Sequence, residues 1–329
     1  EQADFEAQAR VKKQMDKGYR ESEEELDELP LLAMLAGDYR KIGHRIKFPA
    51  YGSKKFDGVR CLVKLVDGKA VLESRTGQPY SVPHLEDELT MLMLASGLKV
   101  LDGEIYKHGH ILQDITSAVK RTDTNKEIEK CQRKVAKEPD NDEAVLDLND
   151  AIAIAELRDK LEFHIFDVPD DRIFTERLGT MQGLEVPIER LGLFHIVLTE
   201  YVYLEDAAAV KHYHDLFVSM GYEGIMIRNF EGLYESGKRS ADLQKYKEFL
   251  DAEFLILRVS KDKDGRAVYE LKNDVNDEEF SCVIGSHKQR LKDVSGLNVG
   301  KYMTVKFQAR YDGTELPQFP TGVAIRDYE

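Results

Sequence analysis

Lys55-Phe56-Asp57-Gly58-Val59-Arg60 is the stretch on which the interpretation of this 329-residue sequence depends. It reads Lys-x-Asp-Gly-x-Arg. We expect a tight turn to hold Lys55 at the mouth of a pocket, where Gly58 lets the backbone come close to a ligand. Arg60 adds a rigid guanidinium fork that suits a phosphate or a ribose edge. Alone, the hexapeptide is equally consistent with a solvated surface turn, because short motifs recur by chance.

A β-hairpin is predicted directly after this motif. Residues 59–66 are rich in apolar and β-branched side chains, Asp67-Gly68 is a turn pair, and 70–74 is the return strand. Cys61 lies in the first strand, and we interpret it as part of the core.

Length and composition predict a soluble two-domain protein. A chain of 329 residues is long for one core, and 42% hydrophobic with 33% charged residues is typical of a globular chain. No apolar run is long enough to span a membrane, and the polar start is unlike a signal peptide. Three dispersed cysteines favour a reducing cytoplasm. The net charge of −14 argues against coating nucleic acid through bulk charge, but not against a local basic groove.

The first two-thirds of the chain alternates predicted strands and helices. An acidic arm at 1–29 reads as a solvated helix or a partly disordered segment. An amphipathic helix is predicted over 83–94, and one buried strand over 193–204. Further strands are expected at 100–106, 161–168 and 223–228, and a later helix is expected at 207–220.

A charged helical hairpin is predicted as an insertion at 123–160. Its second helix carries Val145, Leu148, Ile152 and Ala155 at spacings of three and four, which predicts one apolar stripe. The hairpin either packs on the main body or makes a coiled-coil contact with another protein.

From about residue 252 the pattern changes to short alternating strands separated by turns. Strands are expected at 254–259, 268–272, 280–284 and 302–311. Some 80 residues of this pattern predict a compact OB-type β-barrel. We therefore expect an α+β domain of antiparallel sheets with flanking helices at 30–249, and an OB-fold domain at 250–329.

Six short motifs follow one another along the chain. In order they are Lys55-x-Asp57-Gly58-x-Arg60, Ser74-Arg75-x-Gly77, Asp102-Gly103-Glu104, Phe163-x-x-Phe166-Asp167, Glu223-Gly224-x-x-x-Arg228 and Lys245-x-Lys247. The order resembles the covalent nucleotidyltransferase superfamily, and most closely the small ATP-dependent DNA ligases of the bacteriophage type. The resemblance covers residues 30–329. It implies that the first domain is a nucleotidyltransferase (adenylation) domain.

The resemblance also implies site residues. Lys55 would be the nucleophile that attacks the α-phosphate of ATP and carries AMP as a lysyl-N-AMP intermediate. Lys245 and Lys247, two residues apart on a predicted strand, would reach one phosphate group together. Glu104 and Glu223 would contact ribose and Mg²⁺, which suits sparse carboxylate ligation. Without the resemblance, both glutamates read as surface residues.

Further implied contacts involve aromatic and guanidinium groups. Phe166 would stack on adenine, although core packing is the alternative. Arg60 and Arg75 would contact ribose and the phosphate side of the nick. Arg326 would orient pyrophosphate, with Asp327 beside it in place of the usual Arg-x-Asp-Lys ending. Ser53 is a departure, because many DNA ligases carry Glu or Gln two places before the nucleophile.

The predicted function is an ATP-dependent DNA ligase acting as a monomer on nicked duplex DNA. Lys55 would be adenylated, AMP would move to the 5′-phosphate, and the 3′-OH would attack and release AMP. An mRNA-capping guanylyltransferase and an RNA ligase use the same lysine chemistry and remain alternatives, as does an inactive clamp-binding or scaffold module. The histidine pairs have no partners at zinc-binding spacing.

Overall fold

The computed structural model describes residues 31–326, apart from positions 264, 286, 291–293, 295, 309 and 312. The predicted arm at 1–29 and Asp327 lie outside the described residues. The chain divides into two compact units, Glu1–Tyr246 and Lys247–Glu329. Within the described part, no helix has both the length and the apolar character needed to cross a bilayer.

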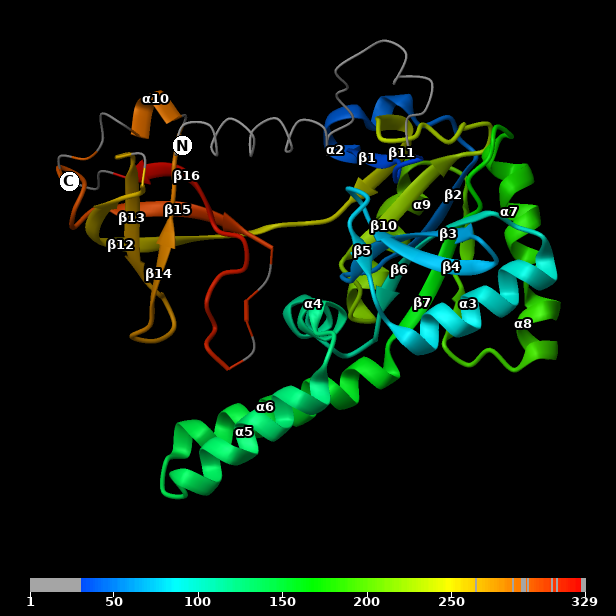
Figure 1. Ribbon diagram of the computed structural model, residues 1–329. Coiled ribbons are helices and arrows are strands. Elements are labelled where there is room, and N and C mark those ends of the chain that lie inside the picture. The colour runs from blue at the N-terminus through cyan, green and yellow to red at the C-terminus, as the bar shows by residue number, and fades with distance from the viewer. Residues whose placement is uncertain are drawn as a thin grey trace, which may run out of the picture. The chain divides into compact units, whose positions relative to one another are not determined.

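The first unit contains two β-sheets (Figure 1). The five-stranded sheet has the order β1 (Leu35–Asp38), β11 (Arg239–Tyr246), β10 (Gly224–Asn229), β2 (Ala50–Lys55) and β9 (Tyr201–Leu204). The six-stranded sheet has the order β5 (Pro79–Tyr80), β4 (Lys69–Ser74), β3 (Val59–Val66), β6 (Val100–Tyr106), β7 (Glu162–Asp167) and β8 (Ile196–Leu198). Pairing is antiparallel except between β1 and β11 and between β7 and β8. The expected mixed α+β architecture is thus present.

Helices cover both sheets of the first unit. They are α2 (Tyr39–Ile42), the 3₁₀ turn η2 (Gly43–Arg45), α3 (Pro83–Ser96), α4 (Leu112–Lys120), α7 (Phe174–Gln182), α8 (Glu185–Leu191) and α9 (Ala207–Ser219). The predicted amphipathic helix is confirmed as α3, which buries Leu85, Leu89, Leu92 and Met93 because they share one face. Helix α9 covers the other sheet through Val210 and Phe217.

The predicted β-hairpin after the lysine motif is confirmed. Strands β3 and β4 pair from Cys61–Ser74 to Val66–Lys69. The turn residues Asp67 and Gly68 have φ of 48° and 76°, as a hairpin turn that follows strand twist requires. Cys61 is fully buried in the core, as expected, and burial raises the pKa of its thiol.

The strand predicted over 193–204 is wrong as a single element. The chain forms β8 and then β9, which belong to different sheets. Thr199 and Glu200 lie between them, and the Thr199 amide donates to Ile165 O (2.8 Å). The polar pair Thr199-Glu200 therefore marks the crossing from one sheet to the other.

The predicted helical hairpin is confirmed as α5 (Thr124–Lys137) and α6 (Asp142–Lys160), which project from the first unit in Figure 1. The predicted apolar stripe on α6 is partly wrong, because Val145 and Ile152 are 36% and 37% exposed. Among the described residues of α6, the buried apolar side chains are instead Ala144, Ala151, Ile154 and Leu157. Contacts with α4 and α5 select this neighbouring face.

Among its described residues, the second unit contains a five-stranded antiparallel sheet and a short helix. Its sheet order is β14 (Glu279–Cys282), β13 (Ala267–Lys272), β12 (Leu250–Lys261), β15 (Tyr302–Phe307) and β16 (Thr321–Arg326), and its helix is α10 (His287–Arg290). A separate core forms around Phe254, Tyr269 and Phe307. Ile284 and Gly322 form an isolated parallel bridge, which joins the segment after β14 to β16.

Candidate active site

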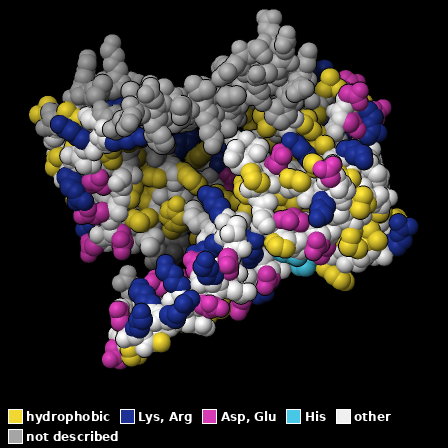
Figure 2. Space-filling model, viewed as in Figure 1, with side chains coloured by type: hydrophobic (Ala, Val, Ile, Leu, Met, Phe, Trp, Pro, Cys, Tyr) yellow, Lys and Arg dark blue, Asp and Glu magenta, His cyan; other side chains and the backbone are white. Residues whose placement is uncertain are grey.

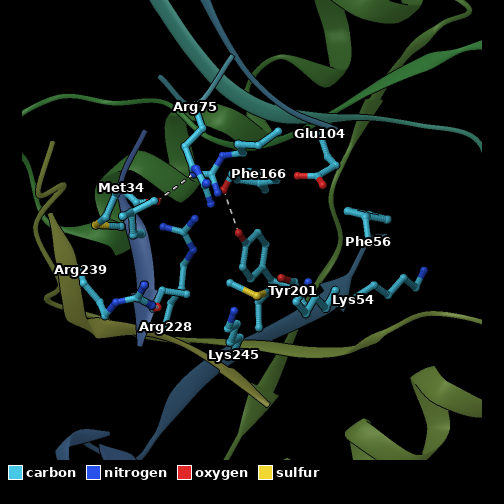
Figure 3. A pocket seen from close by; sticks show the side chains of 16 residues that line it. Met34, Lys54, Phe56, Arg75, Glu104, Phe166, Tyr201, Arg228, Arg239 and Lys245 are labelled. Carbon is cyan, nitrogen blue, oxygen red and sulfur yellow. Dashed lines mark hydrogen bonds between the residues drawn. The ribbon is translucent and has the colours of Figure 1, made fainter. Parts of the chain in front are cut away.

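A cavity of about 210 Å³ lies within the first unit, lined from both of its sheets. Most of its polar lining is cationic: Lys54, Lys55, Arg60, Arg75, Arg228, Arg239 and Lys245. Glu104 is the carboxylate among the described lining residues. This charge distribution suits a ligand with several phosphates. In Figure 3, Arg75, which follows β4, Arg228 of β10, and Arg239 and Lys245, both of β11, reach inward.

Lys55 stands at the end of β2, beside the start of β10. Its backbone pairs with Gly224, and its carbonyl accepts a hydrogen bond from the Glu223 amide (3.0 Å). The Lys55 ammonium forms an ion pair with the Glu223 carboxylate, whose side chain is 6% exposed. The lysine predicted as nucleophile therefore lines the cavity next to one of the two predicted metal-binding carboxylates.

Gly58 makes a close packing contact with β6, and the expected approach of its backbone to a ligand stays a prediction. A Cβ at this position would lie 2.5 Å from Ile105 O and 2.9 Å from the Glu104 Cγ. The turn can therefore sit against β6 only with glycine at this position. That contact holds the Lys55 turn beside Glu104.

Arg60 is fixed by a buried carboxylate. Its Nε and Nη2 donate to Asp102 Oδ1 and Oδ2 at 2.7 and 2.6 Å, and Nη2 also donates to Met34 O at 3.3 Å. Tyr234 donates its hydroxyl to the same carboxylate at 2.6 Å. Burial opposes the charged form of Arg60, but Asp102 outweighs it and the pKa of Arg60 is raised.

Phe166 extends from β7 into the same cavity and is half-buried. The Arg60 guanidinium lies over its ring at 4.4 Å from the centroid, and that of Arg228 lies at 5.8 Å. The Tyr201 hydroxyl donates to the Phe166 carbonyl at 2.8 Å (Figure 3). The ring is thus held at the cavity wall instead of in the core.

Glu104 is a strongly perturbed carboxylate. Burial raises its pKa to about 7, opposed by Arg60 and Lys55, while Glu223 and Asp102 add like-charge repulsion. An acidic group with this pKa in a lined cavity marks a candidate functional site. The two predicted metal-binding carboxylates repel each other, and a bound divalent cation would relieve that repulsion.

The predicted site residues Arg75, Lys247 and Arg326 do not all lie at the cavity. Arg75 lines the cavity as an exposed side chain. Lys247 lies one residue beyond the end of β11 and donates to Gln308 within the second unit. Arg326, also in the second unit, donates from Nε to Thr304 Oγ1 at 2.9 Å. Lys245 lines the cavity, so the predicted lysine pair is divided between the two units.

Sequence reasoning missed the buried network behind the cavity. Asp167 is 1% exposed and accepts from Arg177 (2.8 Å) and Arg228 (2.5 Å). The Arg228 Nε is buried, has no hydrogen-bond partner among the described residues, and belongs to a cavity-lining side chain. The sequence motifs contain two members of this network, because Asp167 and Arg228 are the last residues of two motifs. The sequence analysis assigned no role to either residue. Arg239, which the sequence analysis does not single out, begins β11 and lines the cavity.

Comparisons with known proteins agree on one family. The sequence model of a family described as "ATP dependent DNA ligase domain" matches residues 30–247. The DNA ligase of Enterobacteria phage T4 is 24% identical over 253 residues, which cover 71% of this chain and 51% of that protein. The DNA ligase of African swine fever virus is 28% identical over 228 residues, covering 65% of this chain and 45% of that protein. The chain therefore spans about half the length of the curated relatives it matches.

Two solved structures share the fold. One, described as "DNA binding with a minimal scaffold: Structure-function analysis of Lig E DNA ligases", gives a TM-score of 0.67 at 21% identity and covers 91% of this chain and 100% of that chain. The other, described as "Pmar-Lig_Pre.", gives 0.70 at 20% identity and covers 94% of this chain and 72% of that chain. At these identities the likeness concerns the fold.

Proposed function

The chain belongs to the ATP-dependent DNA ligase family, and from this premise we propose that it seals nicks in duplex DNA at the expense of ATP. The observation that supports the proposal most strongly is the position of Lys55 in a cavity lined by cations, in contact with Glu223. A lysine amine in such a site is suited to phosphoryl chemistry, where positioning and charge neutralisation supply most of the catalysis.

The first proposed step forms a bond between Lys55 Nζ and the α-phosphorus of ATP, and pyrophosphate leaves. Attack requires the neutral amine, because an ammonium has no free electron pair. Lys55 must therefore give up its proton and its ion pair with Glu223. AMP then passes to the 5′-phosphate of the nick, and the 3′-OH displaces it to form the phosphodiester bond.

The cavity offers a role to each predicted ligand of the nucleotide. Arg60, Arg75 and Lys245 would hold ribose and phosphate oxygens. Arg228 would do the same, since its Nε has no hydrogen-bond partner in the part of the chain that the structure describes. Phe166 would stack on adenine. Glu104 and Glu223 fit Mg²⁺, since both are carboxylates beside Lys55 and their mutual repulsion favours a cation. Bound Mg²⁺ would neutralise phosphate charge.

We further propose that the second unit is an OB-fold domain that contacts DNA phosphates and sugars. Five antiparallel strands and the Ile284–Gly322 bridge between the strand ends support this assignment. Lys247 and Arg326 would act from this unit, Lys247 on a phosphate and Arg326 on pyrophosphate. In this proposal the boundary between the domains lies near residues 246–250.

A nick-sealing assay tests the function. The full chain is incubated with Mg²⁺, with ATP or GTP, and with nicked duplexes whose strands at the nick are DNA or RNA. We expect sealing with ATP on DNA strands, and loss of sealing in Lys55→Ala and Glu223→Gln. Covalent transfer of GMP from GTP to the protein would instead indicate a capping-type guanylyltransferase. Sealing of RNA strands alone would indicate an RNA ligase.

A further inference from the structure

Helix α5 presents a stripe of cations that the proposed chemistry does not use. Its members are Lys126, Lys130, Arg133, Lys134 and Lys137, which we call the cationic face. At about 100° per residue these positions fall within one stripe roughly 100° wide, and it runs about 16 Å along the helix axis. All five side chains are exposed. Figure 2 shows Lys and Arg side chains gathered over this hairpin, although the whole chain carries a net charge of −14.

Much of this charge is not neutralised by the protein. Lys134 pairs with Asp147 of α6 at 2.8 Å, and Arg133 lies 3.6 Å from Glu129. Within the described part of the chain, Lys126, Lys130 and Lys137 form no side-chain ion pair. A positive stripe left open in an acidic protein attracts polyanions, which release its counterions on binding.

The apolar residues of α5 lie on its other side. Ile128, Cys131 and Val135 are half-buried, and α5 packs against α6. The cationic face therefore contains no large apolar side chain. Protein interfaces usually depend on buried aromatic or aliphatic anchors at their centre, whereas phosphate contacts depend on Lys and Arg. The chemistry of this face favours a phosphate backbone over a protein surface.

The hairpin is inserted between two strands that contribute to the cavity. These strands are β6, which carries Glu104, and β7, which carries Phe166. At its base, Arg158 donates to Ala118 O (2.6 Å) and Ser81 O (2.5 Å). Because α6 has 19 residues, it extends about 28 Å from this base. That length equals about eight base pairs at 3.4 Å each.

We propose that the cationic face binds the phosphate backbone of the duplex on one side of the nick, as a second DNA contact outside the catalytic cavity. The proposal rests on the proposed function, which makes duplex DNA the substrate. The hairpin would then set how much duplex the enzyme needs on that side. It would supply affinity without base specificity, since lysines at this spacing meet phosphates.

The test compares two triple variants of the full chain. K126Q/K130Q/K137Q removes the three lysines without an ion pair, and Gln matches Lys in helix propensity. K69Q/K99Q/R190Q is the charge-matched control, built on exposed cations of the same unit that do not line the cavity. Affinity for a labelled nicked duplex is measured by fluorescence anisotropy from low to moderate salt. Self-adenylation and circular dichroism are recorded in parallel.

The hairpin variant should bind at least about tenfold more weakly near 0.1 M salt, and its salt slope should be shallower by about two to three. Its self-adenylation should match wild type, and the control should bind like wild type. Shortening one duplex arm below about eight base pairs should weaken wild type and leave the hairpin variant unchanged.

Unchanged affinity and slope in the hairpin variant, or equal losses in the control, would overturn the proposal. The proposal would also be overturned if wild type and the control bound polyglutamate and only the hairpin variant did not, because that result points to an acidic protein partner. If wild type takes up no AMP, the proposed function fails instead. The duplex-binding comparison does not depend on AMP uptake, so the two failures are distinguishable.

Discussion

Asp102 is the buried carboxylate that links Arg60, Tyr234 and, through Arg60, the Met34 carbonyl. It is fully buried, so its removal leaves the Arg60 charge without compensation. Asp102→Asn should lower the free energy of unfolding by about 3–5 kcal/mol, as measured by urea denaturation. Asp147→Asn breaks an exposed pair and should cost less than about 1 kcal/mol. Equal losses of unfolding free energy in Asp102→Asn and Asp147→Asn would contradict the role of Asp102 in compensating the buried charge of Arg60.

Glu104 gives the molecule a specific dependence on pH. Its pKa is about 7 in the folded chain and 4.5 in the unfolded reference, so folding favours its protonated form. This contribution to stability is complete below pH 4.5 and is lost as the pH rises through 7. Glu104→Gln cannot ionise and should escape that loss, which is at most about 3 kcal/mol. The free energy of unfolding of wild type and Glu104→Gln is measured by urea denaturation from pH 4.5 to 8, without nucleotide or metal. The two curves of free energy against pH should diverge, and parallel curves would refute the raised pKa of Glu104.

At the scale of elements, the turn that carries Lys55 depends on a glycine. Gly58→Ala places a methyl group against the Ile105 carbonyl and Glu104, and β6 cannot yield there. We expect a loss of about 1–3 kcal/mol in the free energy of unfolding and weaker self-adenylation. Gly179→Ala in α7 is the matched control, since nothing lies within 4 Å of its Cβ. It should be neutral or stabilising by up to about 1 kcal/mol. A harmless Gly58→Ala would mean that the turn is not constrained by β6.

The helices and strands also show which parts of the fold could be predicted from the sequence. The β3–β4 hairpin and α3 were predicted because their signals are local: a turn pair, and an apolar period that only one face satisfies. On α6 two neighbouring apolar stripes compete, and packing against α4 and α5 selects the one with Ala151 and Ile154. The Asp167–Arg177–Arg228 network was missed because Asp167 and Arg228 are 61 positions apart in the chain. Lys55, Glu104 and Phe166 were found through motif order, not through periodicity.

At the scale of the whole molecule, the two units have separate cores. Phe254 is 1% exposed and packs on Phe280 and Phe307 in the second unit. Phe254→Ala should destabilise that unit by about 3–5 kcal/mol. Differential scanning calorimetry should then show one transition moving down in temperature while the other stays. A joint shift of all transitions would show that the units unfold as one.

The central claim is that Lys55 Nζ carries AMP. The full chain is incubated with ATP and Mg²⁺, digested, and mapped by mass spectrometry under conditions that preserve the acid-labile P–N bond. We expect AMP on the peptide that contains Lys55 and none in Lys55→Ala, with the fold intact by circular dichroism. AMP on another residue, or retained by Lys55→Ala, would contradict it.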